Sequence, residues 1–136
     1  MTSKSKVARE VAEREFARMC EARAIDISES DLSDEDKKQF RELKDDICAM
    51  IQDGRLEISE NGTPTYTAAG GERFTFHEAT GATFMALETY PQEKKVANLM
   101  AALTEMTRSH DGAFSKLKAR DARACMKLGN LFLADR

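Results

Sequence analysis

The sequence is poor in the residues from which catalytic, metal and cofactor sites are usually built. It has two histidines, three cysteines, seven glycines, two prolines and no tryptophan among 136 residues. No stretch approaches the roughly 18 consecutive apolar residues of a membrane-spanning helix. Residues 1–6 lead straight into charged sequence without the apolar core of a signal peptide. We therefore expect a cytoplasmic protein with no membrane partner and no bound cofactor or metal.

The overall composition is that of a globular chain. Hydrophobic residues make up 41% and charged residues 33%, and 21 Lys+Arg stand against 24 Asp+Glu for a net charge of -3. Disordered and fibrous proteins have different compositions. A chain of this length is expected to form a single domain over 1–136. The small net charge gives no general attraction to nucleic acid, so a nucleic-acid partner is not favoured.

The spacing of apolar residues predicts an α+β fold that is mainly α, with about five helices and a small three-stranded antiparallel meander in the middle. Pro91 is expected in the first turn of the fourth helix, because its fixed φ suits that position. The expected parts are a helix pair in 1–54, the meander in 55–78 and further helices in 79–136. The expected helices cover 5–24, 34–53, 80–88, 91–108 and 119–134, and the strands lie around Leu56 and Ile58, at 65–68 and at 73–77.

Three local signals sharpen the predicted boundaries. Ser33 precedes an acidic first turn and is the expected N-cap of the second helix, and Gly54 is its expected left-handed stop. Asn61-Gly62 predicts a two-residue hairpin turn in which both residues have positive φ. Gly70-Gly71 predicts a second turn.

The search for catalytic groups yields no catalytic residue. His77 and His110 stand far apart in elements of different type, and neither has a cysteine or carboxylate at ligand spacing on a helix. Cys20, Cys48 and Cys125 lie on apolar helical stripes, where we interpret them as small buried hydrophobic residues. We expect the protein not to be an enzyme. A small enzyme of unrecognised type stays an alternative, because catalytic partners can meet in space.

Charge is unevenly distributed along the chain. Residues 1–62 carry 11 basic and 16 acidic side chains, net -5, whereas residues 63–136 carry 10 and 8, net +2. Asp121 interrupts the basic residues near the C-terminus, so we interpret them as a solvated face. A small phage or prophage nucleic-acid-associated regulatory protein is the alternative reading. These basic residues are Lys116, Lys118, Arg120, Arg123 and Lys127.

Residues 63–134, about half of the chain, resemble the tail assembly chaperones of tailed bacteriophages, especially small proteins of Mu-like and lambda-like phages. The resemblance implies a protein that coats the helical tape-measure protein, keeps it soluble until tail-tube protein replaces it, and self-associates into a homo-oligomer. The segments that carry it are TYT (65–67), FTFHE (74–78), ATGATFMAL (79–87), AALT (101–104), FSKLKARD (114–121) and LGNLFL (128–133).

Such a role needs an adaptable apolar surface, and methionine is the side chain best suited to irregular partners. Six internal methionines fall on predicted helices, and Met100 and Met106 are the strongest candidates for partner contact. Proteins that bind amphipathic helices present apolar grooves to them. We therefore expect one stripe of the 91–108 helix to be partly exposed or to line a groove: Val96, Leu99, Met100, Leu103 and Met106.

Overall fold

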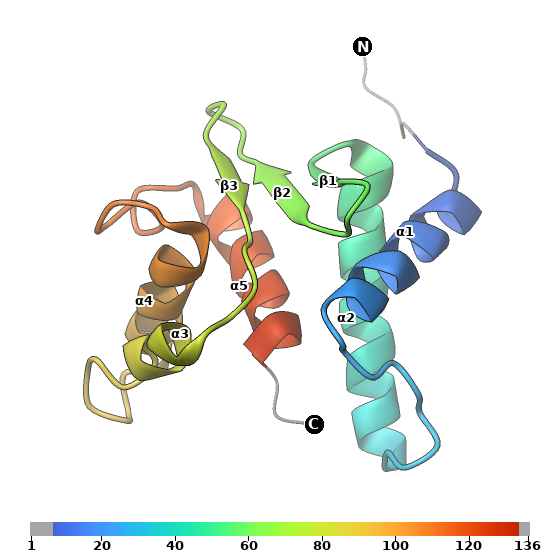
Figure 1. The fold of residues 1–136 in the computed structure, drawn as a ribbon, viewed down its shortest axis with the longest axis horizontal. Helices are drawn as coiled ribbons and strands as arrows, with labels where there is room; N and C mark the ends of the chain where they lie inside the picture. Colours follow the sequence, from blue (N-terminus) through green and yellow to red (C-terminus); the bar gives the residue numbers. More distant parts are fainter. Residues whose placement is uncertain (1–6, 134–136) are drawn as a thin grey trace. The chain divides into compact units, whose positions relative to one another are not determined.

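The computed structural model describes residues 7–133 and confirms the predicted fold class, α+β and mainly α. Three strands form a sheet in the order β1-β2-β3. The chain folds into two compact units, which meet in sequence between Thr65 and Tyr66 within β2; the single domain over 1–136 stays a prediction. The elements (Figure 1) are α1 (Arg9–Ala22), α2 (Asp34–Asp53), β1 (Leu56–Ile58), β2 (Pro64–Thr67), β3 (Arg73–Thr75), α3 (Gly81–Ala86), α4 (Lys95–Thr107) and α5 (Ala119–Leu133).

The N-terminal unit is built on the packing of α1 against α2. The Phe16 and Phe40 rings meet edge to face with their centroids 6.3 Å apart. Apolar residues three and four positions apart on each helix form the buried face, as periodicity predicts. The first helix begins at Arg9, and the predicted start at residue 5 lies outside the described residues.

Helix α2 has the bounds that its end signals predict. The Ser33 side chain accepts a hydrogen bond from the backbone N–H of Asp36, and Gly54 adopts the left-handed conformation with φ of 82°. Three acidic residues occupy the first turn, where the helix dipole favours negative charge. Local sequence therefore determines both ends of α2.

The first hairpin has a three-residue loop, so the prediction of a two-residue turn is wrong. Ser59 N–H donates to the Thr63 carbonyl over 2.9 Å, and Gly62 N–H donates back to the Ser59 carbonyl over 2.9 Å. Gly62 has a φ of 86°, whereas Asn61 does not have positive φ. Instead the Asn61 side-chain oxygen accepts from Thr63 N–H, which favours a turn closed by one left-handed glycine.

A single arginine fastens this loop to α1. The Arg18 guanidinium donates to the Ile58, Ser59 and Glu60 carbonyls and pairs with Glu15 on its own helix. The Ile58 carbonyl belongs to the last residue of β1, and the Ser59 and Glu60 carbonyls follow it in the loop, where the Ser59 carbonyl also accepts from Gly62 N–H. Arg18 thus supplies donors to three consecutive carbonyls at the end of β1.

The second hairpin loop, residues 69–71, repeats this geometry. Ala68 N–H donates to the Glu72 carbonyl over 2.8 Å, and Gly71 has a φ of 97°. Strand β3 ends at Thr75, two residues before the predicted end. His77 N–H leaves the sheet and donates to the Met106 carbonyl at the end of α4, which explains the shorter strand.

Asp121 of α5 ties the hairpin to the helices of the C-terminal unit. Its side chain is almost fully buried and accepts hydrogen bonds from the Tyr66 hydroxyl over 2.6 Å and from Ala69 N–H over 3.1 Å. A buried carboxylate is tolerated only where donors satisfy it, and here a side chain and the hairpin loop supply them. The hairpin is thus fixed on α5 by polar contacts.

Helix α4 begins at Lys95, four residues after the predicted start at Pro91. The reason is the buried side chain of Asn98, which bonds the chain before the helix. Its oxygen accepts from Tyr90 N–H over 2.8 Å, and its amide group donates to the Tyr90 and Pro91 carbonyls. These bonds hold the segment around Pro91 in a non-helical conformation.

All three cysteines are buried and none forms a disulfide, as the apolar stripes predict. Burial away from water, together with the charge of Asp121, raises the pKa of the Cys125 thiol to about 12. A raised pKa means that the thiol stays protonated and unreactive in the folded chain.

Replacing Gly62 with alanine should destabilise the protein more than replacing Gly71. Both glycines have positive φ, which costs other residues about 1–2 kcal/mol. A Cβ at Gly62 would also overlap the Cβ of Ala22, whereas nothing lies within 4 Å of a Cβ at Gly71. Urea unfolding of both variants measures the free energy of unfolding. An equal decrease in both would show that α1 shifts to accommodate the new Cβ without loss of stability.

Folding stability should fall as pH rises above about 9, and Cys125 should contribute to the fall. The folded thiol keeps its proton up to a pH of about 12, while the unfolded thiol loses it near the ordinary pKa of 9.0. Because the folded state then binds more protons, stability is lost at up to about 1.4 kcal/mol per pH unit in this range. Urea unfolding between pH 8 and pH 11 should give a shallower slope for Cys125→Ala, and identical slopes would refute the contribution.

Candidate functional site

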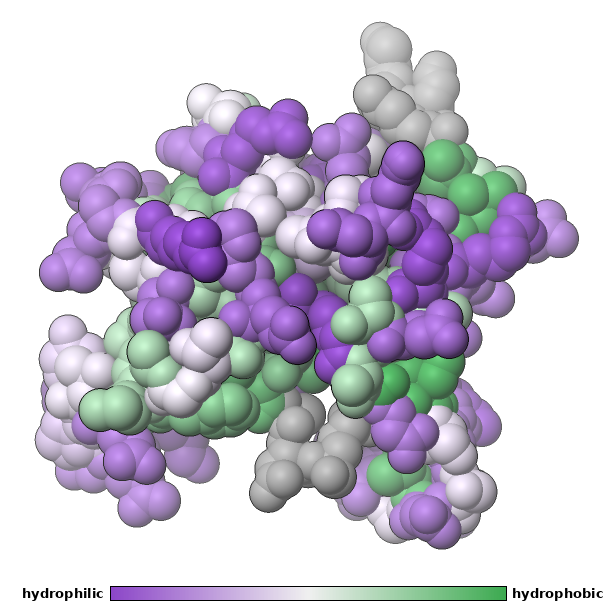
Figure 2. Space-filling view, viewed as in Figure 1, coloured by the Kyte–Doolittle hydropathy of each residue, from purple (hydrophilic) through white to green (hydrophobic). Residues whose placement is uncertain are grey.

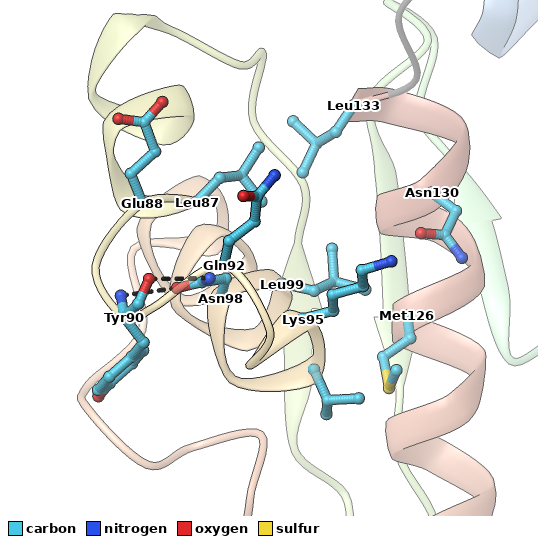
Figure 3. A pocket seen from close by; sticks show the side chains of 11 residues that line it. Leu87, Glu88, Tyr90, Gln92, Lys95, Asn98, Leu99, Met126, Asn130 and Leu133 are labelled. Atoms are coloured by element: carbon cyan, nitrogen blue, oxygen red, sulfur yellow. Dashed lines mark hydrogen bonds between the residues drawn. The ribbon is translucent and has the colours of Figure 1, made fainter.

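An open groove on the C-terminal unit is the candidate functional site. It has a volume of about 880 Å³ and lies between α4 with the segment that precedes it and the C-terminal half of α5 (Figure 3). Its apolar lining residues are Leu87, Val96, Leu99, Met126 and Leu133, and its polar ones are Glu88, Tyr90, Gln92, Lys95, Asn98 and Asn130.

The two helices present different side chains to the groove. Lys95 and Leu99 extend from the first two turns of α4 toward α5, and Met126 lies on the side of α5 that faces α4 (Figure 3). Asn130 lines the groove one turn further along α5. Leu99 follows Lys95 by four residues, and Asn130 follows Met126 by four, so each pair lies on one helix face. The groove therefore has a mixed lining, with aliphatic and thioether side chains beside charged and amide groups.

Gly129 allows the helices to come close at the floor of the groove. A Cβ at this position would lie 2.8 Å from Leu103 Cδ2 and 3.2 Å from Leu99 Cδ1. Both distances are tighter than ordinary van der Waals contact. The missing side chain therefore lets Leu103 pack fully, while Leu99, one turn earlier, stays half-buried and faces the groove.

Asn98 also determines the shape of one groove wall. Its three hydrogen bonds to Tyr90 and Pro91 hold the segment before α4 against the helix (Figure 3). Because the oxygen and the NH2 group of the Asn98 side chain both bond to backbone groups, the position of this wall is set by the fold itself.

The structure divides the five predicted partner-binding residues among three environments. Val96 is 53% exposed and lines the groove with the half-buried Leu99. Met100 is half-buried and lines a separate hollow of about 840 Å³ on the other flank of α4. The prediction of partial exposure is wrong for Leu103 and Met106, whose side chains are 0% and 1% exposed.

Leu103 and Met106 are buried and Val96 is exposed because neighbouring segments pack over only part of α4. Leu103 lies against Gly129 of α5, and the Met106 carbonyl receives the His77 N–H as the chain leaves β3. These segments cover the second half of the helix, whereas its first half keeps part of the same apolar stripe exposed. Apolar periodicity predicts which residues of α4 share a face, but it does not predict how much of that face other segments cover.

Sequence reasoning missed the exposed apolar residues of α3. Phe84 is 50% exposed and Met85 76%, and Figure 2 shows hydrophobic side chains at the surface over this helix. A signal was present, because Phe84, Met85 and Leu87 cannot all share one helix face. Among the described residues, the large hydrophobic side chains classed as exposed are Ile27, Phe84, Met85, Tyr90 and Val96, and four of these five belong to the C-terminal unit.

The methionines divide in the same way. Met19, Met50 and Met106 are buried. Met85 is exposed, Met126 lines the groove and Met100 lines the second hollow. The adaptable thioethers that a partner can reach are thus those of the C-terminal unit.

Both histidines, His77 and His110, lie outside the groove and the second hollow of the C-terminal unit. Within residues 7–133, no group of three or more His, Cys, Asp or Glu side chains is placed to hold a metal ion. No helix in this range has the length and apolar character needed to cross a membrane.

Asp121 interrupts the basic residues near the C-terminus only in part: its carboxylate lies 3.9 Å from the Arg120 guanidinium. The Asp121 side chain is only 2% exposed, because it turns inward to Tyr66 and Ala69. Arg120 and Arg123 are exposed on the same helix.

No protein-family model, no curated protein and no solved structure matches this chain.

Leu103→Ala should destabilise the protein by about 2–5 kcal/mol, because it opens a cavity in a filled core. Val96→Ala should change stability by less than about 0.5 kcal/mol, because Val96 is half exposed to water. Urea unfolding tests both values. A large loss for Val96→Ala would mean that this end of α4 belongs to the core.

Proposed function

We propose that this protein is a non-enzymatic chaperone of phage tail assembly, acting in the host-cell cytoplasm, which binds the tape-measure protein through the groove of its C-terminal unit. The observation that carries the proposal is the concentration of exposed large hydrophobic side chains on this unit beside a groove lined partly by aliphatic and thioether side chains. The sequence resemblance over residues 63–134 supplies the identity of the partner.

The groove suits one face of an amphipathic helix. Such helices dock by apolar side chains at three- and four-residue spacing, and the groove offers aliphatic and thioether side chains from two helices. Exposed apolar patches rimmed by polar residues mark interaction sites. A long helical protein with repeated apolar stripes presents many such faces.

Release matters as much as binding for a chaperone of this kind. The apolar contacts are spread over an open groove and include a flexible methionine, Met126. Contacts of this type re-pack around different partners and give up affinity for breadth. Tail-tube protein then displaces the chaperone, and self-association completes the role that the resemblance implies.

Val96→Asp should abolish the ability to keep the tape-measure protein soluble. The aspartate places a charge among the groove's apolar side chains, while at the second position of α4 it suits the helix dipole and should leave folding intact. The measurement is the soluble fraction of a phage tape-measure protein co-expressed with either form. Unfolding in urea checks that the variant folds.

Ile27→Asp is the matched control. Ile27 is 40% exposed, belongs to the N-terminal unit and does not line the groove. The same introduced charge should therefore leave the tape-measure protein soluble. The proposed function is contradicted if the tape-measure protein is as soluble with the Val96→Asp form as with the unaltered chain. It is also contradicted if the unaltered chain does not keep the tape-measure protein soluble.

A further inference from the structure

The first hairpin loop contains an asparagine followed by glycine, a pair that is prone to spontaneous deamidation. Asn61 is exposed, and Gly62 has no side chain to keep its backbone nitrogen from reaching the asparagine amide carbon. The chain's other asparagines, Asn98 and Asn130, both precede leucine, whose branched side chain hinders the same approach. Asn61 is therefore the asparagine best suited to this reaction.

The reaction needs water and no other reactant. The Gly62 backbone nitrogen forms a bond to Cγ of Asn61, the bond from Cγ to the amide nitrogen breaks, and ammonia leaves with the proton that Gly62 N–H gives up. Water then opens the succinimide ring that has formed. Hydrolysis of the new bond gives aspartate, whereas hydrolysis of the original peptide bond gives isoaspartate, in which the backbone runs through the side chain.

The folded loop opposes this attack at both reacting groups. Gly62 N–H donates to the Ser59 carbonyl over 2.9 Å, so the nitrogen that must lose its proton is held in a hydrogen bond. The Asn61 side-chain oxygen accepts from Thr63 N–H over 3.2 Å and from the Ser59 hydroxyl. Gly62 itself is buried, with its open side against Ala22 of α1. Deamidation therefore requires the loop to open.

Arg18 controls this opening from α1. Its guanidinium donates to the Glu60 carbonyl over 2.9 Å, to the Ile58 carbonyl over 3.2 Å and to the Ser59 carbonyl. The Ser59 carbonyl is also the acceptor for Gly62 N–H. One side chain thus holds the loop in the arrangement that keeps the Gly62 nitrogen bonded.

We infer that Asn61 is a site of spontaneous deamidation that Arg18 keeps closed in the folded chain. Isoaspartate adds a methylene to the backbone between Ser59 and Thr63, so the loop that has opened and reacted does not regain its hydrogen bonds. The change is one-way and marks chains in which the clamp has opened. The site belongs to the N-terminal unit, so the inference does not depend on the function proposed for the groove.

The full-length chain and a synthetic peptide of residues 56–65 are incubated in the same warm, mildly alkaline buffer. Peptide mapping by mass spectrometry measures the aspartate and isoaspartate that form at Asn61. The peptide should deamidate at least about 10-fold faster than the folded chain, because its loop has no protecting structure. Asn130 is also exposed and should stay intact in the chain. Equal rates in the chain and the peptide overturn the inference.

Arg18→Ala should raise the deamidation rate of the chain about 10-fold, because three hydrogen bonds that hold the loop are lost. Arg14→Ala is the matched control, since it removes an exposed arginine one turn earlier on α1 and should leave the rate unchanged. Arg18→Lys should give an intermediate rate, because a single amine cannot span three carbonyls.

Phe40→Leu separates opening of the loop from unfolding of the whole unit. It weakens the contact with Phe16 away from the loop, and urea unfolding measures the loss of stability in each variant. Phe40→Leu should leave the deamidation rate near that of the unaltered chain. The inference is overturned if the rate follows the free energy of unfolding in every variant, or if neither Arg18 variant deamidates faster than the unaltered chain.

Discussion

The close approach of α5 to α4 at Gly129 is the constraint on which the C-terminal unit depends. Without a Cβ at this point, Leu103 enters the core and the two helices meet. One turn earlier on α4, Leu99 is only half-buried, and the space beside it is the groove. The same contact therefore fills the core and creates the candidate site.

Irregular segments in both units are held by one polar side chain that reaches out from a helix. Arg18 binds three carbonyls at the first hairpin, Asp121 binds the Tyr66 hydroxyl and the second hairpin loop, and Asn98 binds the chain before α4. Backbone groups outside regular ladders need other partners, and these side chains supply them without a longer sheet. Three strands of three or four residues gain order in this way.

Helices and their ends could be predicted from the sequence where interactions between neighbouring residues determine them. Ser33 and Gly54 determine the ends of α2, and apolar periodicity gives each of the five helices. The errors arise where a distant or side-chain bond competes. Asn61 bonds within its loop in place of adopting positive φ, and Asn98 delays the start of α4 beyond Pro91. Neither hydrogen bond can be predicted from the spacing of apolar residues.

The candidate site was less predictable than the fold because exposure depends on what covers a helix. Val96 and Leu103 belong to one stripe of α4, yet one is half exposed and the other is buried. The difference comes from α5, whose glycine lies beside Leu103 and whose Met126 faces the groove. The apolar stripe of one helix does not show which part of it other segments cover, and in α4 that cover separates an exposed half from a buried half.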